Sequence, residues 1–170
     1  MTEEVQVDTP EQIAIRDLQD TDIFTGLSDS DLEQVATSCT RRIFQAGECC
    51  AVQGAATDEI GVINNGKVAI ETRIEVTPYT QRLRLCILTR GNMVSWPALL
   101  KPNILTASAR CMGETEIIYI KAAHLLHLFK ERPSIEPVVM KNLATVLNSR
   151  LKDSWSQLTG LVSEMVKQGR

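Results

Sequence analysis

The sequence lacks any long apolar run. Hydrophobic residues make up 44% of the chain, but nowhere do they approach the ~20 consecutive positions needed to span a bilayer. The start, Met1 to Glu4, is acidic and has neither the basic residues nor the apolar stretch of a secretory signal. We therefore expect a protein of the cytoplasm with no membrane segment. The net charge of −3 gives no general electrostatic attraction to nucleic acid.

The motifs of common catalytic and metal sites are missing as well. The five cysteines are odd in number and never spaced as CxxC, so they predict neither a disulfide framework nor a zinc site. The chain has no nucleophile elbow, no metal-ligand cluster and no glycine-rich phosphate loop. These absences favour a protein that is not an enzyme and needs no metal or cofactor. We interpret the adjacent Cys49 and Cys50 as structural thiols rather than a redox pair.

What the sequence does contain is a long central region with the periodicity of β-strands. The length of 170 residues fits one domain with terminal extensions. From Arg41 to Tyr119, short β-branched runs alternate with turn residues. The clearest strand runs from Val68 to Val76, and its partner follows Pro78. About eight short strands fit, enough for a jelly roll of the double-stranded β-helix type.

Helical signals flank this region on both sides. Thr9 and Pro10 have the chemistry of a helix start, and Ser28 begins a second helix. A short helix is expected over 123–129, and Ser134 then caps a long helix that ends close to Lys167. We therefore expect a mainly β fold with N-terminal helices and a long C-terminal helix, divided into an N-terminal helical extension (1–22), a β-roll domain (23–133) and a C-terminal dimerisation helix (134–170).

Four short motifs, in order, resemble the cyclic nucleotide-binding domain family. Ile23–Ser28 is similar to the family's opening "LF.GLS", and Val62–Val68 is similar to its "YIILSGKV" strand and turn. Between them lie Phe44–Glu48 and Gln53-Gly54, at the expected spacing. The resemblance covers residues 23–151. It implies a jelly-roll domain that senses a small molecule and passes the signal to a partner.

In that family a phosphate-binding cassette, written FGELAL and followed closely by RSA or RTA, holds the ligand. The same stretch here is 94–108, without a gap. Trp96 takes the position of the family's ribose-binding glutamate, and Leu105 that of its phosphate-binding arginine. Neither can pair with a cyclic phosphate as an arginine does, so we do not expect cyclic AMP or cyclic GMP to be the ligand. The resemblance implies a ligand pocket lined by Val94, Ser95, Trp96, Ala98, Leu99, Leu105, Thr106, Ala107 and Ser108.

Three interpretations of this altered cassette remain open. The pocket could be adapted to a less charged, aromatic or hydrophobic ligand. Alternatively Trp96 could fill it as part of the core, since one indole can bury ~150 to 250 Å², leaving a structural module that only dimerises. The third alternative is residual binding of a cyclic nucleotide.

The long C-terminal helix carries apolar residues at alternating spacings of four and three, which is a heptad pattern. It predicts a parallel homodimer, with packing against the chain's own roll as the alternative. In the resembling family's transcription factors a helix-turn-helix follows this helix, whereas this sequence ends at Arg170, so we expect no direct reading of DNA. The predicted dimer interface consists of Asn148, Leu151, Trp155, Leu158, Val162 and Met165.

Overall fold

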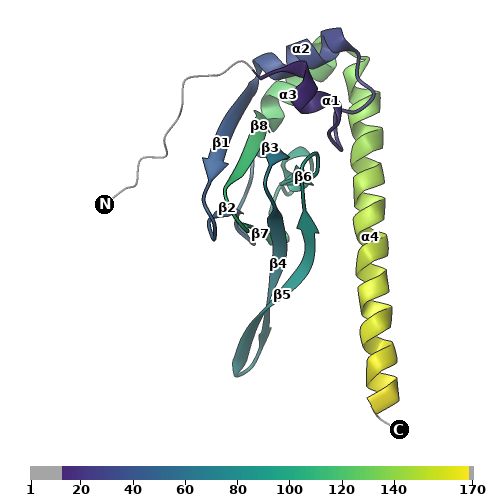
Figure 1. Cartoon of the computed structure of the whole chain (residues 1–170). Coiled ribbons are helices and arrows are strands. Elements are labelled where there is room, and N and C mark those ends of the chain that lie inside the picture. Colours follow the sequence, from purple (N-terminus) through teal and green to yellow (C-terminus); the bar gives the residue numbers. More distant parts are fainter. Residues whose placement is uncertain (1–12, 169–170) are drawn as a thin grey trace.

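A computed structural model describes residues 13–168, which form a β-roll of two antiparallel sheets with helices at one end and along one side (Figure 1). One sheet has the strand order β1-β8-β3-β6 and the other β2-β7-β4-β5. This confirms the predicted jelly roll and its number of strands. The strands are β1 (Cys39–Phe44), β2 (Cys49–Ala51), β3 (Glu59–Asn65), β4 (Val68–Val76), β5 (Tyr79–Leu88), β6 (Met93–Val94), β7 (Ser108–Cys111) and β8 (Thr115–Lys121).

The first sheet separates two hydrophobic cores, because its central strands are apolar on both faces. On β8, Ile118 and Ile120 belong to a core shared with the helices, whereas Ile117 and Tyr119 belong to the core between the two sheets. This alternation follows from the two-residue period of a strand. The core between the sheets leads into the region of the predicted cassette, since it includes Leu105.

Glycine closes the turn between β3 and β4, as the sequence indicated. Gly66 has φ of +94°, a left-handed conformation that side chains disfavour. A Cβ at this position would lie 2.6 Å from Thr115 Oγ1 and 2.7 Å from the Glu114 carbonyl oxygen. The predicted turn at Gly47 also has a positive φ, of +86°.

The helices are α1 (Ile15–Gln19), α2 (Asp29–Thr37), α3 (Ala122–Glu131) and α4 (Ile135–Gln168), with a 3₁₀ helix, η1 (Trp96–Leu99). Ser28 caps α2 as predicted, because its hydroxyl accepts a hydrogen bond from the Asp31 amide at 3.2 Å. The first helix was predicted wrongly. Residues 13 and 14 are not helical, and α1 starts only at Ile15, where the Asp17 carboxylate accepts the Ala14 N–H. Thr9 and Pro10 lie outside the described residues.

Helix α4 is buried along its first turns and only partly covered by the roll further on. Ile135, Val139 and Leu143 are buried in the core beside the helices. Beyond them α4 continues beside the roll towards the far tip of the β4–β5 hairpin (Figure 1). Two hydrogen bonds fix this part to the roll: Arg150 Nη2 donates to the Met93 carbonyl at 2.5 Å, and Gln157 Nε2 donates to the Leu85 carbonyl at 2.6 Å.

Candidate functional site

The cassette segment is held in place by its backbone. Ser95 has a left-handed conformation, with φ of 60° and ψ of 32°, which turns the chain from β6 into η1. Further along, the Leu105 amide donates to the Ala55 carbonyl, and the Gly54 amide donates to the Leu105 carbonyl, both at 2.8 Å. These paired bonds fasten the segment to the loop after β2, and so set the positions of Leu105 and Thr106.

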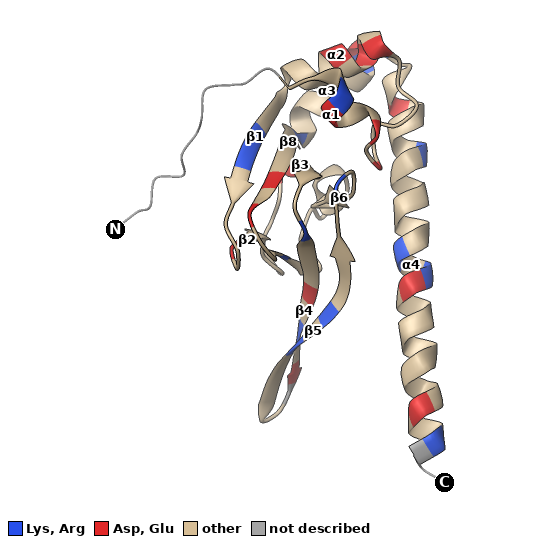
Figure 2. Ribbon diagram, viewed as in Figure 1, with Lys and Arg blue, Asp and Glu red and all other residues tan. Residues whose placement is uncertain are grey.

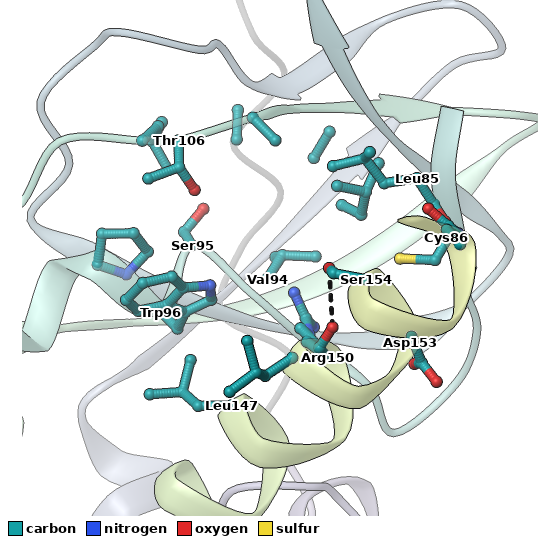
Figure 3. A pocket seen from close by; sticks show the side chains of 18 residues that line it. Leu85, Cys86, Val94, Ser95, Trp96, Thr106, Leu147, Arg150, Asp153 and Ser154 are labelled. Atoms are coloured by element: carbon teal, nitrogen blue, oxygen red, sulfur yellow. Dashed lines mark hydrogen bonds between the residues drawn. The ribbon is translucent and has the colours of Figure 1, made fainter. Parts of the chain in front are cut away.

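A pocket of about 320 Å³ lies between this segment, the roll and α4 (Figure 3). This volume is at the lower end of the range for small-molecule sites, ~300 to 1,000 Å³. Most of its lining is apolar. The roll contributes Ala51, Ile70, Leu85, Cys86 and Ala109.

The structure brings most of the predicted ligand-binding residues together. Ala98 and Leu99 do not line the pocket but pack against the core beside the helices. Ser108 is also outside the lining, and its hydroxyl accepts a hydrogen bond from the Gln53 amide at 3.0 Å. The remaining six predicted residues form one wall: Val94, Ser95, Trp96, Leu105, Thr106 and Ala107.

Within this wall, Trp96 lies between the pocket and the helices. Its side chain is half-buried and packs against the core beside the helices, while another part of it faces the pocket. Leu105 is buried, with 8% of its surface exposed. The hydroxyls of Ser95 and Thr106 point towards each other at the edge of the pocket furthest from Cys86 (Figure 3). They are the polar groups of an otherwise apolar wall.

Sequence reasoning missed the opposite wall, which α4 provides. Its residues recur every three or four positions, as expected for one face of a helix. That stripe lies next to the heptad pattern and shares Leu151 with it, so the same spacing test could have revealed it. The α4 residues of the pocket are Leu147, Arg150, Leu151, Asp153, Ser154 and Gln157.

Arg150 is the cation of this wall. It is partly buried, and burial lowers the pKa of its guanidinium, although nearby Cys86, Asp22 and Asp153 favour the charged form. Among the described residues no carboxylate forms an ion pair with it. Its hydrogen bond to the Met93 carbonyl links α4 to the residue just before the cassette. Arg150 therefore touches both walls of the pocket.

The predicted dimer residues of α4 are exposed, apart from the contact of Leu151 with the pocket. Trp155 is 61% exposed, Leu158 59% and Met165 72%. No charged residue lies between Asp153 and Glu164, which leaves a long uncharged stretch on the lower half of α4 (Figure 2). The alternative of packing against the chain's own roll does not describe these side chains.

Two of the cysteine thiols, those of Cys39 and Cys50, are largely enclosed by the fold. Burial raises the pKa of the Cys50 thiol to about 12, and it raises the pKa of the Cys39 thiol to about 12 as well. Within residues 13–168 there is no group of three side chains able to hold a metal ion. None of the helices in that range is both long and apolar enough to cross a membrane.

Comparisons with known proteins agree with this architecture. Curated proteins show no match to the chain. The catabolite activator protein of Thermus thermophilus is 25% identical to this chain, with a TM-score of 0.68. The match covers 84% of this chain and 63% of the Thermus protein. A cyclic nucleotide-binding domain from Methylobacillus flagellatus is 14% identical, with a TM-score of 0.77 over 86% of this chain and 83% of its own. The profile of the cyclic nucleotide-binding domain matches residues 41–132, more than half of the 170 residues. The chain belongs to the cyclic nucleotide-binding domain family.

Proposed function

We propose that the chain is a cytoplasmic, non-catalytic ligand-sensing domain whose ligand is not a cyclic nucleotide bound in the usual way. The observation that carries this proposal is the position of the pocket between two walls. One wall is the cassette segment with Trp96 and Leu105, and the other is α4. A molecule in the pocket contacts both, so its binding energy acts on the position of α4.

The open space beside Trp96 supports a pocket rather than a plug. If the indole filled the cavity, the wall around it would enclose no volume of about 320 Å³. The buried Leu105 supports the second part of the proposal, because it offers an apolar surface where the family's cassette has a guanidinium. At that position a cyclic phosphate would meet an apolar surface instead of the bidentate guanidinium that the family's cassette supplies.

We further propose that α4 passes the signal on through a homodimer read by a partner protein. The support is the exposed apolar stripe along the uncharged stretch of α4, since a solvated helix normally carries charged residues there. Leu151 belongs to both the stripe and the pocket lining, so ligand contact and helix pairing share a residue. Asn148 within the stripe would fix the register of the pair.

Mass spectrometry of gently purified protein under native conditions tests the sensing proposal. We expect a co-purifying small molecule that is lost on denaturation. The matched control is Ala107→Trp, which places an indole in the pocket lining and should remove the bound mass without unfolding the domain. A wild-type protein that carries nothing, together with no change in stability when the pocket is filled, would favour the structural module.

A further inference from the structure

Arg150 has far more hydrogen-bonding capacity than the fold uses. A guanidinium carries five N–H donors, and within residues 13–168 this side chain makes one hydrogen bond, to the Met93 carbonyl. A carbonyl accepts a hydrogen bond but does not neutralise the charge. The rest of the guanidinium belongs to the lining of a mainly apolar pocket. A cation placed there has lost part of its hydration, and among the described residues it forms no ion pair in return.

The two carboxylates near Arg150, those of Asp22 and Asp153, do not form ion pairs with it. Asp22 accepts hydrogen bonds from Asn92 Nδ2 at 3.1 Å and from the Met93 amide at 3.3 Å, which fixes the start of β6. Asp153 is exposed, and its carboxylate points away from Arg150 (Figure 3). Of the described residues that line the pocket, Arg150 is the sole cation. The pocket therefore offers one positive charge that forms no ion pair with a described residue.

The size and surface of the pocket define the rest of the ligand. A volume of about 320 Å³ equals about ten times the ~30 Å³ that a water molecule occupies in the liquid. Most of its remaining surface is apolar, as at Val94, Trp96, Leu105 and Leu151, and its other polar groups are few. A ligand with two negative charges would leave one of them unpaired in this environment, which is costly. A single charge on an apolar body matches both features.

Building on the proposed sensing function, we propose that the pocket binds a small amphipathic monocarboxylate, with an apolar body of about ten heavy atoms, whose carboxylate pairs with Arg150. The cation of this site then comes from α4, on the wall opposite Leu105, where the family's cassette has its arginine. The carboxylate takes N–H donors that the Met93 carbonyl leaves free. Ligand binding thus acts on the same side chain that makes one of the two hydrogen bonds fixing α4 to the roll.

Matched pairs of acids and neutral amides test this proposal on the full chain. Octanoate and 4-phenylbutyrate are compared with octanamide and 4-phenylbutanamide by isothermal calorimetry. We expect each acid to bind the wild type at least tenfold more tightly than its amide. Arg150→Gln should remove this preference, whereas Arg82→Gln, an equal change of charge at an exposed residue outside the pocket lining, should keep it.

A second variant covers the case in which Arg150→Gln fails to fold. Asp153→Asn removes the negative charge beside Arg150 and should tighten binding of the acids, while binding of the amides stays unchanged. Equal affinities for acid and amide in the wild type would overturn the monocarboxylate and leave the pocket's sensing role intact. Absence of binding by both members of both pairs would overturn the monocarboxylate and also count against sensing.

Discussion

Truncation of Trp96 distinguishes a pocket wall from a core plug by the size of its cost. Replacing a buried tryptophan with alanine in a closed core costs ~3 to 5 kcal/mol, because a cavity is left behind. Trp96 is half-buried and borders a pocket that already exists, so Trp96→Ala enlarges an open space and loses only the contacts with the helical core. We therefore expect about half that cost, ~2 kcal/mol.

The measurement is made in a Trp155→Phe background, where Trp96 is the single tryptophan of the chain. Urea unfolding followed by far-ultraviolet circular dichroism gives the free energy with and without the indole. Iodide quenching of the Trp96 emission reports its accessibility, and we expect partial shielding. A loss of more than ~4 kcal/mol in the free energy of unfolding would refute the role of Trp96 as a pocket wall and support its role as a core plug. Strong quenching with no cost at all would place this segment on an uninvolved surface.

Three further predictions follow from the cassette, the long helix and a buried carboxylate. Cyclic AMP or cyclic GMP at ~1 mM should shift the melting temperature by less than ~1 °C, because each lost charge-assisted bond weakens binding by ~1.5 to 3 kcal/mol; a shift of several degrees would contradict this. Leu158→Glu should give a folded monomer by light scattering and Ser156→Glu, off the apolar stripe, should stay dimeric, whereas a monomeric wild type would exclude the dimer. Asp31→Asn should lower the free energy of unfolding by ~2 to 3 kcal/mol, because the carboxylate accepts hydrogen bonds from Arg132 at 2.8 Å and Ser134 at 3.1 Å. These bonds hold the pKa of Asp31 below its ordinary value. In the wild type the contribution of the ionised carboxylate to the free energy of unfolding is therefore complete above about pH 4 and is lost as the pH falls further. Urea titrations of both proteins at several pH values would show this difference.

The fold was largely predictable because the β-roll depends on local patterns. The period of two over β4, the short apolar runs of β3 and β8 and the glycine turns are properties of neighbouring residues. Ser28 could be recognised as a cap for the same reason. The start of α1 was not predictable in this way. The motif at Thr9 suggested a cap, whereas the structure has the first described helix begin at Ile15.

Only one wall of the site could be predicted. Positions 94–107 were found because the cassette is contiguous in sequence and its frame is ungapped. The wall formed by α4 depends on how a helix that starts at Ile135 is aligned against the roll, which no local pattern encodes. Arg150 therefore looked like one surface charge among several. Its position beside Met93, 57 residues earlier in the sequence, appears only in three dimensions.

The length of α4 gives it the mechanics of a lever. At 1.5 Å per residue, the 18 residues from Arg150 to Gln168 extend about 27 Å beyond the guanidinium. A tilt of ~10° at Arg150 would displace the last turn by about 5 Å. A small change of angle at the pocket would thus become a larger displacement at the end of the helix. Distance measurements between labels near Lys167 would therefore report the movement of α4 that the proposed ligand binding beside Trp96 requires.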